Sequence, residues 1–287
     1  MAHVNRKIIQ ARIGMVNFIN TAPLYEKWQT LVHRPEWHIT EAPPTTLNTL
    51  LYNNELDLGF VSSHEYASHP HLYRVLTGLS ISATGPVGSV FLFSKRDPRH
   101  LSGRTVLLSS LSQTSVALVK IILEEYYQVA PQYESGTVSP EGIPPLTESG
   151  HQVDAVLAIG DNALRLRERG LFPIKLDLSE IWLQKTGLPF VFAVWAVREE
   201  FCRDYPHIVA EIQEELIRCV EEGKRDLRSI CQVVAPRIPM EANDCFDYLS
   251  GMEYDLSSEK LKAIEVFFEY LIKRGEVPSE SLPVKFV

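Results

Sequence analysis

The sequence has few basic residues and no apolar run long enough to cross a membrane. Its 28 Lys and Arg residues are outnumbered by 36 Asp and Glu residues, which gives a formal net charge of −8. Nucleic acids and anionic membranes bind clustered positive charge, so we expect no partner of either kind. Residues 1–7 are polar and lack the apolar stretch of an export signal, and we therefore expect a cytoplasmic protein. Any anionic ligand of this acidic chain must be held by local dipoles.

The sequence also lacks the motifs of common cofactor and metal sites. Neither the dinucleotide-binding pattern G-x-G-x-x-G nor the nucleophile pattern G-x-S-x-G occurs. His69 and His71 flank Pro70 and have no third ligand in their segment, which favours a surface loop over a metal site. The cysteines lie in the last third of the chain without a C-x-x-C pair, and we interpret them as reduced packing residues: Cys202, Cys219, Cys231 and Cys245. We expect no metal and no organic cofactor.

Short strand-like segments alternate with helical ones, a pattern that favours an α/β fold with largely parallel sheets. Residues 11–16 have the pattern of a strand, and a helix is expected over about 22–31. Apolar residues recur at helical spacing between 114 and 127, which predicts an amphipathic helix. A chain of 287 residues is long enough for one large domain or for two lobes.

Two apolar runs, at residues 87–94 and 190–197, differ from the other strand-like segments. They lack strict alternation and are rich in Val and Phe, as expected of strands buried on both faces. They bracket one complete α/β segment. We therefore predict one lobe from residues 1–92 together with 197–287, a second lobe from 93–196, and two crossover strands between them.

Small polar residues follow four of the predicted strands, which end near residues 16, 61, 108 and 159. A strand-to-helix junction gathers free backbone N–H groups and the positive end of a helix dipole. Four such junctions predict a cleft for a small polar anion. The substrate-binding candidates within them are Thr21, Ser62, Ser63, Thr114, Ser115, Gly160 and Asp161.

Helix capping is a structural alternative for several of these side chains. Ser62 and Glu65 have the spacing of a capping box, in which the hydroxyl binds the N3 amide and the carboxylate returns to the cap residue. Capping explains either Thr114 or Ser115, but not obviously both. Asp161 most simply caps the helix that follows Gly160, although a carboxylate near the cleft could also act as a base.

Seven short motifs carry a family resemblance that covers nearly the whole chain. They read FINTAPL at 18–24, VSSHEY at 61–66, GLSI at 78–81, GPVGSV at 85–90, TSVAL at 114–118, IGD at 159–161 and TGLPFVFAVW at 186–195. In this order they resemble the chorismate dehydratase family of the futalosine route to menaquinone. The resemblance implies the two-lobed α/β fold of type II periplasmic binding proteins.

The resemblance also implies a reaction and its residues. The family removes water from chorismate and leaves 3-[(1-carboxyvinyl)oxy]benzoate, and its functional asparagine and serine fall here on Asn20 and Ser89. The family often has Tyr-Leu before the asparagine, whereas this chain has Phe18 and Ile19 and so lacks a phenol hydroxyl. The related dihydroxynaphthoate synthases typically open with Ser-Pro-Cys-Pro-Asn-Asp, which is absent here. The dehydratase is therefore preferred.

Two questions stay open from the residues alone. Asn20 could simply cap the following helix and Ser89 could fill a small space, and the same cleft could bind a small carboxylate without changing it, as a cytoplasmic binding protein or sensor does. The proton acceptor could be Asp161 or the enolpyruvyl carboxylate of the substrate itself. Because the motifs contain no arginine, we expect substrate carboxylates to meet helix-start N–H groups and the hydroxyls of Ser63, Thr114 and Ser115.

Overall fold

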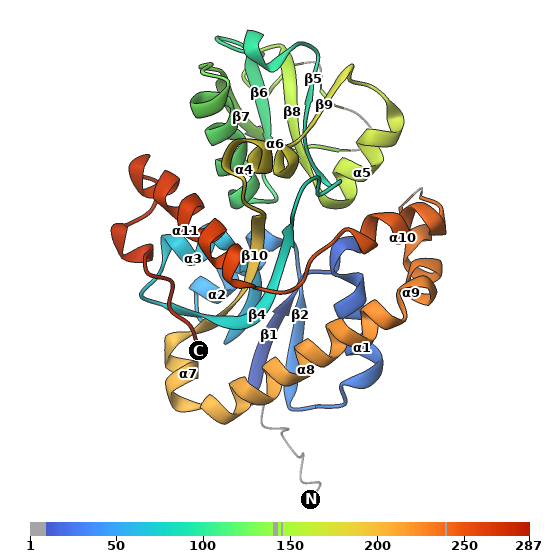
Figure 1. Ribbon diagram of the computed structural model, residues 1–287, viewed down its shortest axis with the longest axis vertical. Helices are drawn as coiled ribbons and strands as arrows, with labels where there is room; N and C mark the ends of the chain where they lie inside the picture. Colours follow the sequence, from blue (N-terminus) through green and yellow to red (C-terminus); the bar gives the residue numbers. More distant parts are fainter. Residues whose placement is uncertain (1–9, 140–142, 145, 239) are drawn as a thin grey trace, which may run out of the picture.

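The computed structural model describes residues 10–139, 143–144, 146–238 and 240–287, which form two α/β lobes, drawn one above the other in Figure 1. Each lobe is built on a five-stranded sheet. The first sheet has the order β2-β1-β3-β10-β4, with β1 Ala11–Met15, β2 Trp37–Glu41, β3 Leu58–Ser62, β4 Tyr73–Ala83 and β10 Phe190–Arg198. The second has the order β7-β6-β8-β5-β9, with β5 Val90–Ser94, β6 Thr105–Ser109, β7 Gln132–Gly136, β8 Val153–Ile159 and β9 Ile174–Asp177.

The two sheets share one topology. In the first sheet β1 pairs in parallel with β2 and β3, and β10 runs antiparallel to β3 and β4. In the second sheet β6 pairs in parallel with β7 and β8, and β5 runs antiparallel to β8 and β9. The parallel strands β1, β3, β6 and β8 each lead into a helical segment, so all four predicted junctions lie at carboxyl ends of parallel strands. In open α/β sheets, ligands bind at this edge.

Helices of the first lobe come from both ends of the chain. They are α1 Ala22–Leu31, preceded by the 3-10 turn η1 Ile19–Thr21, then α2 Pro44–Tyr52, α3 Ser63–Ser68, α7 Glu199–Asp204, α8 Pro206–Arg225, α9 Leu227–Val234, α10 Ala242–Ser250 and α11 Ser258–Lys273. The second lobe has α4 Gln113–Ile121, continued by the wider π-helical turn η3 Ile122–Tyr126, with α5 Gly160–Arg169 and α6 Leu178–Thr186. Short 3-10 turns are η2 Pro98–His100, η4 Ala235–Arg237 and η5 Ser279–Ser281. The predicted helices at 22–31 and 114–127 are confirmed, the second with its π-helical end.

The connections between the sheets do not fall where the predicted boundaries of 92/93 and 196/197 would put them. Residues 90–92 pair with β8 and β9 in the second sheet, and residues 190–196 lie in the first sheet beside β3 and β4. The chain therefore passes between the sheets at 84–89 and at 187–189. A continuous apolar run marks a strand buried within one sheet, so it locates the strand but not the turn that leads to it.

The apolar core continues from one lobe to the other on the side of the crossovers. Trp182 of α6 makes edge-to-face contacts with Phe190 of β10 and Phe267 of α11, with ring centroids 5.3 and 6.2 Å apart. Phe190 and Phe267 also contact each other at 5.1 Å. Such aromatic pairs stabilise the folded state by more than the burial of their apolar area alone. In Figure 1, α11 correspondingly lies along β10 and reaches toward α6.

The carboxyl-terminal third of the chain returns to the edge of the cleft. Helix α8 packs so closely on α1 that a Cβ at Gly223 would lie 2.1 Å from the carbonyl oxygen of Pro23. Further on, the chain runs beside β4, where the Ser80 and Ser82 amides donate to Tyr254 and Glu253. This return fixes the start of α1 and brings residues 248–254 next to the junctions. Among the described residues, no helix has the length and apolar character needed to span a bilayer.

Candidate functional site

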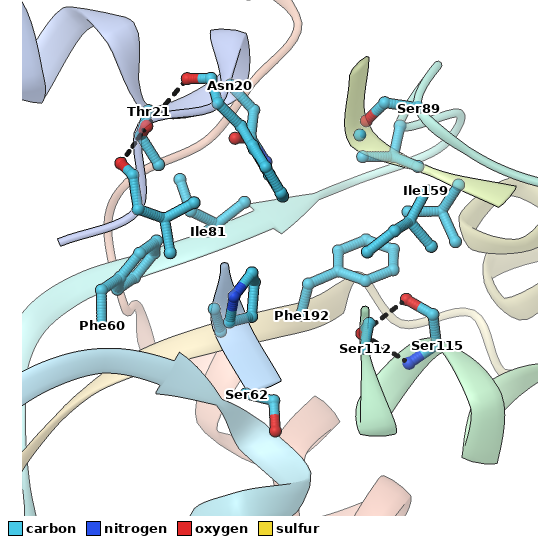
Figure 2. A pocket seen from close by; sticks show the side chains of 17 residues that line it. Asn20, Thr21, Phe60, Ser62, Ile81, Ser89, Ser112, Ser115, Ile159 and Phe192 are labelled. Carbon is cyan, nitrogen blue, oxygen red and sulfur yellow. Dashed lines mark hydrogen bonds between the residues drawn. The ribbon is translucent and has the colours of Figure 1, made fainter. Parts of the chain in front are cut away.

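A pocket lies between the two sheets. Figure 2 shows Asn20, Thr21 and Ser89 on one side of Phe192, and Ser62, Ser112 and Ser115 on the other. The lining residues come from both lobes: Val16, Phe18, Asn20, Thr21, Pro44, Phe60, Ser62, Ile81, Val87, Ser89, Val90, Ser112, Ser115, Ile159, Gly160, Phe192 and Ala193.

None of these lining residues carries an ionisable side chain. Aliphatic and aromatic groups form most of the wall, and hydroxyls, one amide and backbone groups supply its polarity. Arg198 donates to the carbonyl oxygens of Leu51 and Tyr52, and Arg165 donates to that of Arg237, so both arginines are committed elsewhere. A charged ligand here must be held by neutral donors and helix dipoles.

Asn20 has an unused acceptor in this pocket. Its side-chain oxygen is buried, yet it has no hydrogen-bond partner among the described residues. Its backbone carbonyl, in contrast, accepts from the hydroxyl of Tyr254 at 2.8 Å. An unpaired buried amide is costly, and polar groups of this kind in folded proteins normally have a partner. The amide oxygen of Asn20 is therefore an acceptor that the described residues leave free.

Ser89 and Ser115 each accept a hydrogen bond and keep their own proton free. The Ser89 hydroxyl accepts from the Tyr248 hydroxyl at 2.8 Å, and the Ser115 hydroxyl accepts from Ser112 at 3.1 Å. In both cases the donor is a neighbouring side chain that fixes one lone pair. A serine hydroxyl has one donor and two acceptor sites, so each can still donate into the pocket.

Gly160 brings the start of α5 to the pocket wall. Its φ of +56° lies in the left-handed region, and a Cβ would come within 3.2 Å of the Phe18 ring. The N-cap residue Ile159 offers no side chain to cap α5, and the Gly160 amide donates to the Ser89 carbonyl at 2.7 Å. Glycine thus permits both the turn and the close approach of Phe18 from the other lobe.

Thr21 and Ser62 line the pocket, but their hydroxyls already serve the backbone and their neighbours. Thr21 donates to the carbonyls of Val16 and Phe18 at 2.7 and 2.8 Å. Ser62 accepts from the Glu65 amide and from Asn48, each at 3.1 Å. The serine half of the predicted capping box is therefore present.

The other half of that capping box is wrong. The Glu65 carboxylate does not return to Ser62, because it accepts from the Tyr73 hydroxyl at 3.1 Å and pairs with His69 at 2.9 Å. Burial raises the pKa of Glu65, while His69 and Tyr73 oppose that rise. His69 is thus bound to a carboxylate. Within the described residues, no group of three or more His, Cys, Asp or Glu side chains is arranged to hold a metal ion.

Ser63 and Thr114, predicted to bind a ligand, instead contact each other between the lobes. Both are buried, and their hydroxyl oxygens lie 3.3 Å apart. Ser63 donates to the Val191 carbonyl at 2.9 Å, and Thr114 accepts from the His64 amide at 3.0 Å. Neither lines the pocket. The two hydroxyls therefore join α3 to α4. The sequence around each helix start does not reveal this contact, because the two helices are far apart in the chain.

Asp161 also joins the lobes and does not cap α5 as expected. Its carboxylate accepts from the Ile19 amide of the other lobe at 3.2 Å, and it does not line the pocket. Burial raises the pKa of Asp161, while the Ile19 amide, Arg165 and Arg237 partly offset that rise. The carboxylate binds the Ile19 amide, at the start of η1, because this buried amide has no partner within its own helical turn.

Two tyrosines beside the site were missed by the sequence analysis. Tyr248 binds Ser89, and Tyr254 binds the backbone of Asn20. Both come from the carboxyl-terminal segment, more than a hundred residues from their partners. Neither stands at a strand-to-helix junction, so only the return of the chain along β4 could have revealed them.

Comparison with known proteins places the chain in a family. A sequence model described as menaquinone biosynthesis matches residues 11–273. The chain belongs to the menaquinone biosynthesis family. Within the curated proteins it is 33% identical over 278 residues to the chorismate dehydratase of Thermus thermophilus, a match that covers 90% of this chain and 94% of that protein.

Solved structures show the fold that this family member shares with binding proteins. A protein from Archaeoglobus fulgidus superposes with a TM-score of 0.71 at 18% identity, covering 93% of this chain and 98% of that one. The periplasmic aliphatic sulphonate binding protein SsuA of Escherichia coli gives a TM-score of 0.64 at 14% identity, covering 94% and 89%. The two-lobed periplasmic-binding-protein fold expected from the motifs is confirmed.

Thr114→Val tests the contact between the lobes. The substitution keeps the side-chain shape but leaves the His64 amide without its acceptor. We expect the free energy of unfolding in urea to fall by about 1 kcal/mol. The matched control is Thr30→Val on α1, where the exposed hydroxyl donates only to carbonyls of its own helix, and this variant should stay within about 0.5 kcal/mol of the parent. Equal stabilities of the two variants would refute the role of Thr114 in joining the lobes.

Asp161→Asn tests the burial of the carboxylate. An amide oxygen can still accept from Ile19 but does not ionise. Because the folded-state pKa of Asp161 is raised, the unfolded chain releases this proton more readily, and ionisation costs the parent stability as pH rises above about 4. The variant should therefore gain stability relative to the parent between acid and neutral pH, measured by urea unfolding. A relative loss over that range would mean that Arg165 and Arg237 outweigh burial.

Proposed function

We propose that this chain is a chorismate dehydratase, a hydro-lyase that removes water from chorismate and leaves 3-[(1-carboxyvinyl)oxy]benzoate. The observation that carries the proposal is that one uncharged pocket contains both a free acceptor, the unpartnered amide oxygen of Asn20, and a free donor, the hydroxyl of Ser89. The Thermus thermophilus relative that bears this enzyme name supports it across most of both chains. As part of the proposal the enzyme acts in the cytoplasm, because a substrate with two carboxylates does not cross a bilayer unaided.

The pocket chemistry suits this substrate. Chorismate is a six-membered ring with two carboxylates and a hydroxyl, and the pocket offers apolar walls such as Phe60 and Phe192 with neutral donors around them. Its carboxylates would face the starts of α4 and α5, near Ser115 and Gly160, where helix dipoles favour negative charge. In this proposal the two lobes divide near residues 84–89 and 187–189 and close around the ligand.

The reaction needs positioning more than strong acids or bases. The C3–H electron pair becomes a ring double bond, the C4–O bond breaks, and the released proton and hydroxide leave as water. Aromatisation of the ring drives the step. Asn20 would accept from the 4-hydroxyl and orient it, and Ser89 would donate to the departing oxygen as negative charge develops there.

The proton acceptor in this proposal is the enolpyruvyl carboxylate of the substrate. The lining residues include no carboxylate or imidazole, and the carboxylate of Asp161 is held by the Ile19 amide beside the pocket. The enolpyruvyl group is attached through oxygen to C3, the carbon that loses the proton. An internal base at that position requires no titrating side chain from the protein.

Incubation of the purified protein with chorismate tests the function directly. We expect loss of chorismate absorbance and a product lighter by one water, detected by mass spectrometry without added metal or cofactor. Binding of chorismate without product formation would support a binding protein on the same fold, and the absence of both would reject chorismate as the ligand.

Asn20→Ala and Ser89→Ala test the assigned roles. Removal of a hydrogen bond made in the transition state typically lowers kcat by about 10² to 10³. Asn20→Ala should cost little stability, because the amide oxygen has no protein partner to lose. Asn53→Ala and Ser257→Ala, at exposed helix ends, are the matched controls and should turn over normally. Normal kcat in both pocket variants would discard these two residues as the catalytic groups.

A further inference from the structure

The Tyr248 hydroxyl forms a hydrogen bond with the side chain of Ser89. It donates to the Ser89 hydroxyl oxygen at 2.8 Å from helix α10, on the carboxyl-terminal segment. The tyrosine ring lies against the backbone at Gly88, where a Cβ would come within 3.3 Å of the ring and where φ is +73°. The glycine before Ser89 thus leaves the space that the ring fills.

Tyr248 reaches the site only through Ser89. It is absent from the pocket lining and faces an outer groove together with Gly88, Arg167 and Asp247. Burial raises the pKa of Tyr248, with Asp161 and Cys245 adding to the rise and Ser89 and Arg167 opposing it. The phenol therefore stays protonated at neutral pH and acts as a hydrogen-bond donor.

A fixed donor on one side of a hydroxyl determines where its proton can point. The Ser89 side chain is 99% buried, since its relative exposure is 1%, and its carbonyl is held by the Gly160 amide. With Tyr248 occupying one lone pair, the Ser89 proton turns away from the tyrosine. Without that bond the hydroxyl could instead donate toward the outer side, where it serves no substrate.

We propose that Tyr248 is a positioning residue, which holds the Ser89 hydroxyl with its proton directed at the leaving oxygen of the substrate. This inference rests on the proposed dehydratase function and assigns a role to a residue outside the pocket. The bond also links the carboxyl-terminal segment to Ser89, which directly precedes β5 of the second lobe. The Ser89 hydroxyl is therefore held in this position only when these two parts are in contact.

Tyr248→Phe tests the proposal because it keeps the ring against Gly88 and removes only the hydroxyl. We expect kcat for chorismate to fall about tenfold, the value of one neutral hydrogen bond, with KM changed less than about threefold. The matched control is Tyr270→Phe, which removes a tyrosine hydroxyl bond to Tyr126 of the other lobe at 3.3 Å, where neither residue lines the pocket. Its kcat should equal that of the parent.

The double variant Tyr248→Phe with Ser89→Ala separates positioning from direct action. If Tyr248 acts through Ser89, its loss should lower kcat no further once the serine hydroxyl is gone. A further loss in the double variant would overturn the proposal, since it would mean that Tyr248 acts on the substrate itself. A single variant with normal kcat, or with a raised KM alone, would also overturn it and would assign the bond to lobe closure.

Turnover by the parent protein keeps this test separate from that of the proposed function. If the parent converts chorismate and Tyr248→Phe matches it, only the positioning role fails. Thermal unfolding of each variant accompanies the kinetics, and a Tyr248→Phe protein that unfolds near the parent temperature while losing kcat supports positioning over a general loss of structure.

Discussion

The structure depends on one constraint: among the described residues, the pocket wall has no ionisable side chain. A dianion can be held in such a pocket only if many weak dipoles converge on it, because no single neutral donor offsets the loss of water around a carboxylate. Convergence requires several helix starts at one place. Two sheets of the same topology, facing each other with the carboxyl ends of their parallel strands, provide that place.

At these helix starts, one residue lines the pocket and its neighbour in the sequence contacts the other lobe. Ser62, Ser115 and Gly160 line the pocket, whereas their sequence neighbours Ser63, Thr114 and Asp161 contact the opposite lobe. Successive residues of a helix point about 100° apart, so one junction can present one group to a ligand and the next to the other lobe. The pocket lining and the contact between the lobes are thereby built from adjacent positions, and a change at one is expected to affect the other.

The sequence was sufficient for the parts of the fold that depend on local patterns. The strand-to-helix junctions and the helices expected at 22–31 and 114–127 follow from the local apolar pattern, whereas the π-helical end of the second helix does not. The identity of the family followed from ordered motifs and is shown independently by its sequence model. The predicted lobe boundaries differ from the observed connections at 84–89 and 187–189. An apolar run shows that a strand is buried within a sheet, but it does not show to which of the two sheets the strand belongs.

Contacts between distant segments explain what the sequence could not supply. Tyr248 and Tyr254 approach Ser89 and Asn20 only because α8 packs on α1 through Gly223 and the following chain runs beside β4. No periodicity encodes that return. For Asn20, the residue type is visible in the sequence, but the absence of a hydrogen-bond partner for its buried amide oxygen among the described residues depends on how distant segments pack around it.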